Sequence, residues 1–177
     1  MGGPEAGIRV LGIVGSLGAR SSNLTLLETA VSVAPDGVKV VLYTGLGELP
    51  HFQPDIDPDD APPTVRALRQ AIAASDAVLI AAPEYGHSLP GVLKNAIDWL
   101  IGSGELEGKV VAITASVPSA ERGRQGLAAL RQTLGAVRAV IVSDEPIARG
   151  PTSEATMRDV LRRLVDGVVR EARQRRG

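Results

Sequence analysis

The sequence predicts an α/β fold, a three-layer sandwich in which helices cover both faces of a five-stranded parallel sheet. Three observations predict this fold. Short apolar, β-branched runs alternate with helical periods along the whole chain. Most of these runs are almost continuously apolar, which is typical of strands that are covered on both faces. The 177 residues, 44% of them hydrophobic, suffice for roughly one domain with a substantial core. We therefore expect a single domain over residues 1–177.

The order of the elements supports this interpretation. The predicted strands are short and mostly apolar, and comprise residues 9–14, 38–43, 77–82, 109–115 and 138–142. Apolar side chains recur at helical spacing between them, at Leu24, Leu27 and Val31, at Val65, Leu68 and Ile72, at Val92, Leu93, Ala96, Ile97 and Leu100, and at Leu127, Leu130 and Leu134. The last helix is the clearest, with one stripe formed by Met157, Val160, Leu161, Leu164, Val165, Val168 and Val169. Five strand–helix units with right-handed crossovers favour the flavodoxin-like strand order 2-1-3-4-5.

Composition excludes several classes of protein. With no cysteine, the chain has neither disulfides nor thiolate metal sites. A net charge of -1 provides no basic surface for nucleic acid. No apolar run approaches the roughly 18 residues of a membrane helix, and the N-terminus lacks a signal-peptide pattern, so we expect a cytoplasmic protein without membrane insertion. The acidic, proline-rich residues 45–63 are interpreted as a solvated loop rather than a metal site, because no ordered ligand spacing accompanies the carboxylates.

A loop rich in hydroxyl groups follows the first predicted strand. Residues 15–23 read Gly-Ser-Leu-Gly-Ala-Arg-Ser-Ser-Asn and lead directly into a helix. A helix start leaves backbone N–H groups unpaired and carries a positive partial charge, which favours a phosphate. The candidate phosphate donors are Ser16, Ser21, Ser22 and Asn23. Taken alone, the stretch fits equally well a simple helix N-cap preceded by a glycine turn.

The absence of two known nucleotide-binding motifs limits the class of ligand that this loop could bind. The loop has no lysine at the position that a Walker motif requires, and Gly12, Gly15 and Gly18 do not form G-x-G-x-x-G. The second strand ends in Leu42-Tyr43-Thr44, without the acidic residue that would hold a ribose. The remaining hypothesis is a cradle for a phosphomonoester, consistent with a mononucleotide such as FMN.

A second loop follows the third predicted strand and begins with Pro83. This proline ends the strand ladder, and Tyr85 offers an aromatic face at the carboxyl edge of the sheet. Gly86 allows a planar ligand to approach the backbone. Pro90 is placed to start the next helix.

These two loops closely resemble those of the NADPH-dependent FMN reductase family, which are flavodoxin-like flavoproteins that include quinone, azo and metal-oxyanion reductases. The resemblance covers essentially the whole chain and is most specific in Pro83-Glu84-Tyr85 followed by Ser88-x-Pro90-Gly91-x-Leu93-Lys94-Asn95-Ala96-Ile97-Asp98-Trp99. It implies a flavodoxin-like FMN-binding domain in which Ser16, Ser21 and Asn23 surround the FMN phosphate. It also implies that Pro83, Glu84, Tyr85 and Gly86 contact the isoalloxazine, largely through their backbone.

The chain departs from the family pattern at two places. Many relatives have arginine where this chain has Gly18, and many have asparagine where it has Gly86. Arg20 could supply the displaced charge, although sixteen arginines against three lysines indicate a compositional bias that weakens any single arginine as evidence. The exit of the fourth strand is expected to form a third wall, where Ser116 could reach the flavin. Arg122 or Arg124 could face a pyridine-nucleotide phosphate or simply lie in solvent.

The resemblance implies an FMN-dependent NAD(P)H oxidoreductase with NADPH or NADH as the electron donor. Hydride would pass from nicotinamide to flavin N5 and then to a quinone, azo, flavin or metal-oxyanion acceptor by a ping-pong mechanism, and the cofactor would carry the chemistry, so no catalytic residue is predicted. The alternative is a non-catalytic flavodoxin-like electron carrier, which a charge of -1 disfavours because carriers commonly have acidic docking surfaces.

Two further expectations concern rival chemistry and assembly. Ser16, His87 and Ser88 suggest a serine hydrolase, but the chain has no G-x-S-x-G elbow and no identifiable carboxylate partner. The family resemblance implies a homodimer or homotetramer that uses the helix predicted over residues 90–102.

Overall fold

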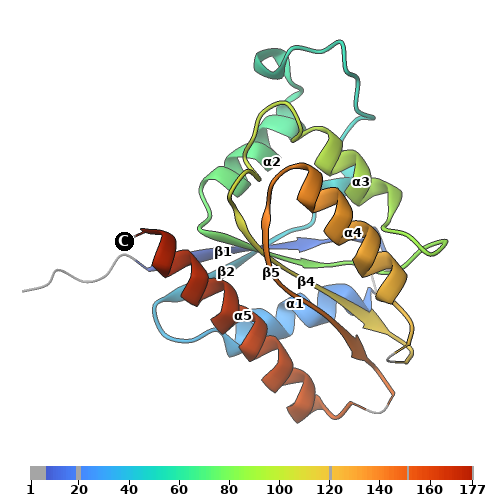
Figure 1. Ribbon diagram of the computed structural model, residues 1–177, viewed down its shortest axis with the longest axis vertical. Coiled ribbons are helices and arrows are strands. Elements are labelled where there is room, and N and C mark those ends of the chain that lie inside the picture. The colour runs from blue at the N-terminus through green and yellow to red at the C-terminus, as the bar shows by residue number, and fades with distance from the viewer. Residues whose placement is uncertain (1–6, 19–20, 120, 151, 177) are drawn as a thin grey trace, which may run out of the picture.

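The computed structural model describes residues 7–18, 21–119, 121–150 and 152–176. Five parallel strands form one sheet in the order β2-β1-β3-β4-β5, as predicted (Figure 1). The strands are β1 (Ile8–Val14), β2 (Val38–Tyr43), β3 (Ala77–Ala81), β4 (Val110–Val117) and β5 (Val140–Ala148). Because β1 and β3 are neighbours although β2 follows β1 in the chain, the strand order reverses at β1, and ligands of open α/β sheets bind at such a point.

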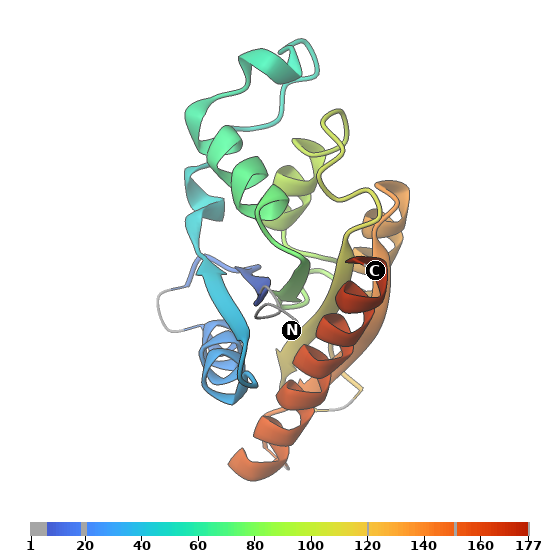
Figure 2. The same cartoon turned by 90° about the vertical axis from the view of Figure 1, so that its left-hand side faces the viewer.

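Within the described residues, five helices cover the two faces of the sheet. They are α1 (Ser22–Val33), α2 (Pro63–Ala73), α3 (Gly91–Asp98), α4 (Arg124–Ala136) and α5 (Glu154–Arg176). α1 and α5 lie on one face of the sheet, and α2, α3 and α4 lie on the other (Figures 1 and 2). Apolar side chains of each group pack against the sheet and form two core clusters. β3 and β4 are buried along their whole length, which explains their continuously apolar sequence. No described helix has the length and apolarity that crossing a bilayer requires.

The fifth strand is longer than the sequence predicts. We expect it to end at Val142, but β5 continues through a polar stretch to Ala148. It lies at the edge of the sheet, where half-exposed polar residues and Pro146 are tolerated because only one side of the strand pairs. The pairing with β4 shifts register between Val111 and Ala112, where β5 carries one extra residue. The extension carries the chain to the carboxyl edge of the sheet.

The first helix also differs in detail. Leu26, Leu27, Ala30 and Val33 form its buried face, whereas Val31, which the spacing assigned to that face, is exposed. This short apolar sequence is compatible with more than one buried face, and the predicted face of Leu24, Leu27 and Val31 is not the one that packs against the sheet. The helix position is unaffected, so its N-terminus still faces the first loop.

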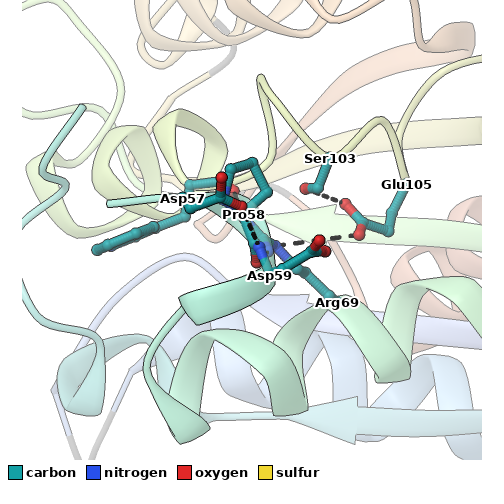
Figure 3. A network of polar contacts seen from close by, with 7 residues as sticks. Asp57, Pro58, Asp59, Arg69, Ser103 and Glu105 are labelled. Carbon is teal, nitrogen blue, oxygen red and sulfur yellow. Dashed lines mark hydrogen bonds and ion pairs between the residues drawn. The ribbon is translucent and has the colours of Figure 1, made fainter. Parts of the chain in front are cut away.

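The long connection between β2 and α2 is solvated as predicted, since residues 51–60 are exposed except the half-buried Ile56, but contacts also attach it to the rest of the fold. It contains two 3₁₀ turns, η1 (Gly45–Glu48) and η2 (Pro58–Asp60). Arg69 of α2 donates to the carbonyl oxygens of Pro58 at 2.6 Å and Trp99 at 2.8 Å, and its Nε lies 3.9 Å from the carboxylate of Glu105 (Figure 3). One arginine therefore joins the loop, α2 and the segment after α3.

Candidate functional site

A cleft of about 730 Å³ opens at the carboxyl edge of the sheet, beside the reversal between β1 and β3. Three segments provide its walls: the loop after β1, the loop after β3, and the ends of β4 and β5. The described residues that line it are Ser16, Gly18, Ser21, Ser22, Asn23, Pro83, Glu84, Tyr85, Ser116, Val117, Pro118, Arg122, Gly123 and Arg149. A cleft of this size lies within the range of small-molecule and cofactor sites.

Hydroxyl groups gather at one end of the cleft, where α1 begins. The hydroxyls of Ser16 and Ser21 lie 2.5 Å apart, within hydrogen-bond distance. Ser21 is also the N-cap of α1, because its hydroxyl accepts the backbone N–H of Asn23 at 3.3 Å. The N-cap and the phosphate-cradle interpretations are thus compatible, since the same residue starts the helix and faces the cleft.

Asn23 connects two walls of the cleft. Its side chain is buried, and its amide oxygen accepts the backbone N–H of Ser116 at 2.8 Å. That oxygen is therefore committed to the end of β4. The contact fixes the distance between the first loop and the third wall.

The loop after β3 is a tight hairpin turn. The backbones of Tyr85 and Ser88 exchange two hydrogen bonds of 3.0 Å, and the two central residues, Gly86 and His87, have φ of 56° and 61°. Both values are positive, which defines a type I′ turn and favours glycine or asparagine at these positions. Gly86 adopts such a φ without steric cost, because it has no side chain. The turn presents the Tyr85 side chain, 60% exposed, at the cleft.

The carboxylate of Glu84 turns away from solvent into the start of α4. One oxygen accepts the backbone N–H of Gly126 at 2.9 Å, and the other lies 3.4 Å from Nδ1 of His87. The Gly126 hydrogen bond, which outweighs the opposing effect of burial, lowers the pKa of Glu84, and His87 lowers it further. A Cβ on Gly126 would lie 2.9 Å from Cβ of Glu84, so this close approach requires glycine.

We expect replacement of Glu84 by glutamine to change how stability depends on pH. Because the folded-state pKa of Glu84 is lowered, its stabilising contribution is present above the unfolded pKa of about 4.3 and is lost as pH falls through the folded pKa. Thermal unfolding midpoints of the wild type and Glu84→Gln should therefore differ most near neutral pH and converge in acid. A constant difference down to acidic pH would contradict the assigned contact.

The exit of β4, where the sequence predicts a third wall, contributes Val117, Pro118 and Gly123 to the lining of the cleft. The sequence interpretation missed Arg149, which also lines the cleft and follows β5 directly. The guanidinium of Arg149 donates to the hydroxyl of Ser22 at 3.3 Å. Arg149 was missed for two reasons: the predicted fifth strand ended too early, and the compositional excess of arginine weakened every individual arginine.

The structure brings together eight of the ten predicted cofactor-binding residues: Ser16, Ser21, Ser22, Asn23, Pro83, Glu84, Tyr85 and Ser116 all line the cleft. Gly86 lies at the tip of the turn, beside the lining residues. Arg20 lies outside the described residues. Of the two arginines predicted near a nucleotide phosphate, Arg122 lines the cleft.

The rival hydrolase hypothesis gains no support from the described geometry. His87 is exposed and lies beside Glu84, while Ser88 bonds to Tyr85 through its backbone. Neither residue is arranged as a nucleophile with its base.

The donor set fits FMN. A phosphate dianion requires several donors, and hydroxyls at the start of a 12-residue helix, with a guanidinium beside them, provide these at one end of the cleft. The other end, at Pro83 and Tyr85, offers an aromatic surface and exposed backbone for a planar ring. The fold is flavodoxin-like, and the cleft offers the kinds of donor and surface that a mononucleotide requires.

Comparison with known proteins identifies the family. The family described as NADPH-dependent FMN reductase matches residues 8–151, and the chain belongs to this family. The predicted family, the flavodoxin-like fold, the oxidoreductase class and the pairing of FMN with an NAD(P)H donor are thereby confirmed.

Individual relatives agree with this assignment. An NAD(P)H-dependent FMN reductase of Pseudomonas aeruginosa is 41% identical over 133 residues, covering 72% of this chain and 69% of the relative. A quinone reductase of Escherichia coli K12 is 34% identical over 139 residues, covering 77% and 74%. The structure resembles that of FerB, a flavoenzyme NAD(P)H:(acceptor) oxidoreductase from Paracoccus denitrificans, with a TM-score of 0.75 and 28% identity over 92% of this chain and 98% of FerB.

Proposed function

We propose that the protein is a single-domain NAD(P)H-dependent reductase that binds FMN in the cleft and passes electrons to a small-molecule acceptor such as a quinone. The observation that carries the proposal is the joining, in one cleft, of the hydroxyl cluster at the start of α1 with the Tyr85 turn. Azo compounds, free flavin and metal oxyanions are further acceptor classes in this proposal. The bound flavin would supply hydride acceptance from nicotinamide at N5 and its delivery to the acceptor.

In this mechanism the residues of the chain bind and orient FMN. Ser16, Ser21 and Ser22 would hold the phosphate, and the buried Asn23–Ser116 contact keeps the first and third walls at a fixed spacing. The backbone of residues 83–86, which leads into the type I′ turn, would hold the ring. Preorganised donors of this kind stabilise the charge that develops on a reduced ring without reorganising.

Glu84 is assigned a positioning role rather than a proton transfer. Its carboxylate accepts the N–H of Gly126, and its lowered pKa keeps it ionised at neutral pH. It therefore joins the turn after β3 to the start of α4, and holds the second and third walls together.

The ping-pong order follows if donor and acceptor use the same exposed face. The Tyr85 side chain and the cleft mouth lie open to solvent, so NAD(P)+ would leave after hydride transfer and before the acceptor stacks in its place. We place the protein in the cytoplasm, where nicotinamide donors are regenerated.

Anaerobic mixing tests the proposal. FMN-loaded protein should lose its visible flavin absorbance on addition of NADPH or NADH and recover it on addition of benzoquinone, with parallel lines in double-reciprocal rate plots. Bleaching by dithionite but by neither nicotinamide would support the electron-carrier alternative. Intersecting lines would overturn the ping-pong order.

We also propose a homodimer or homotetramer that uses the face around α3. Ile101, 61% exposed, lies just after this helix, and Leu17 is exposed beside the cleft.

Light scattering should give a multiple of the 18.4 kDa chain mass. Ile101→Glu should shift the mass toward the monomer, because a charge would be buried in the contact. The matched variant Val142→Glu, at an exposed position on the β5 edge, should not. A wild-type monomer would contradict the proposal.

A further inference from the structure

Arg149 is placed by the sheet at the phosphate end of the cleft. The register pairs Ala148 with Val117, and the backbone N–H of Arg149 donates to the carbonyl of Val117 at 2.8 Å. Ile147 and Ala148 are buried, so the chain is anchored immediately before the arginine. Its side chain then crosses to the start of α1, where it donates to the Ser22 hydroxyl. The anchored backbone and this hydrogen bond place the guanidinium of the exposed Arg149 side chain beside the start of α1.

We infer that Arg149 supplies the positive charge that binds the FMN phosphate in this protein. The inference rests on the proposed function, because it assumes FMN in the cleft. A phosphomonoester carries a charge of about -1.5 to -2 at pH 7, and the serine hydroxyls at the cradle are neutral. The described residues of the first loop, 15–18 and 21–23, include no basic side chain. Arg149 brings a positive charge to this loop from the opposite edge of the sheet.

The other basic side chain among the described lining residues occupies a different wall. Arg122 belongs to the loop after β4, just before the Gly123 N-cap of α4. Arg149 instead contacts Ser22, the first residue of α1, which belongs to the proposed phosphate cradle. Because Arg149 contacts a residue of the proposed phosphate cradle, we assign the phosphate charge to Arg149 rather than to Arg122. Because a guanidinium forms strong, charge-assisted hydrogen bonds to phosphate, its removal should affect phosphate-bearing ligands selectively.

The test compares FMN with riboflavin, which has the same ring but no phosphate. Dissociation constants are measured by quenching of flavin fluorescence for the wild type, Arg149→Gln, Arg149→Lys and Arg20→Gln. The control is Arg158→Gln, because Arg158 also donates to a serine hydroxyl of α1, that of Ser32 at 3.1 Å, but does not line the cleft. The FMN measurements are repeated at several salt concentrations.

Arg149→Gln should weaken FMN binding by about 10- to 100-fold, leave riboflavin affinity nearly unchanged and reduce the salt dependence of FMN binding. Arg149→Lys should retain part of the FMN affinity, and Arg158→Gln should retain all of it. Equal losses for FMN and riboflavin would assign Arg149 a purely structural role and overturn the inference. An unchanged FMN affinity in Arg149→Gln would also overturn the inference. Loss of FMN affinity in Arg20→Gln would then assign the phosphate charge to Arg20. Failure of the wild type to bind either flavin would instead refute the proposed function.

Discussion

Replacement of Gly15 by alanine is expected to destabilise the protein by about 1–3 kcal/mol and to weaken FMN binding. The backbone N–H of Gly15 donates to the carbonyl of Ala81 at 2.8 Å, just beyond the last β1–β3 pair. A Cβ at residue 15 would lie 2.6 Å from Cβ of Ala82 and 3.0 Å from its Cα. Neither atom can rotate away, so the loop after β1 must separate from β3. Urea denaturation measures the loss in stability, and flavin fluorescence measures the loss in affinity.

Gly18 provides the matched control in the same loop. A Cβ there would meet no atom within 4 Å, so Gly18→Ala should leave stability within about 0.5 kcal/mol of the wild type. If Gly15→Ala were as stable as Gly18→Ala, the close packing of the first loop against the end of β3 would be wrong.

Replacement of Gly123 by alanine should cost about 2–4 kcal/mol, because two effects combine. Gly123 has a φ of 88°, in the left-handed region that L side chains avoid, at the N-cap of α4. A Cβ would also overlap Cγ1 of Val117, at the buried end of β4. Since both residues line the cleft, the third wall should shift, and FMN affinity should fall along with the unfolding midpoint.

Replacement of Gly135, near the other end of α4, should change stability in the opposite direction. It has no neighbour within 4 Å of a built Cβ and lies within α4, so Gly135→Ala should stabilise the protein by about 0.5–1 kcal/mol. Equal effects of the two substitutions in urea denaturation would contradict the conformation assigned to Gly123.

The sheet and the first two walls of the cleft could be predicted because their signals are local. β3 and β4 are buried on both faces and therefore read as continuous apolar runs. The serines at the start of α1 and the residues around Tyr85 follow strands whose carboxyl ends meet at one edge of the sheet.

The remaining features depend on contacts between distant residues. β5 is an edge strand with a register shift, so its polar half resembles a loop and the position of Arg149 could not be inferred. The carboxylate of Glu84 contacts Gly126, 42 residues away, and no local pattern predicts that pairing. Arg69 likewise holds residues 58 and 99 together, which converts an acidic, proline-rich sequence into an attached loop.

Titration of the purified protein with FMN, followed by removal of free ligand on a desalting column, tests the assignment of the cleft most directly. We predict that the protein emerges yellow, with a perturbed flavin spectrum and one FMN per chain, and that riboflavin is retained less well. A colourless protein that leaves all the FMN in the free fraction, while circular dichroism shows it to be folded, would contradict the account.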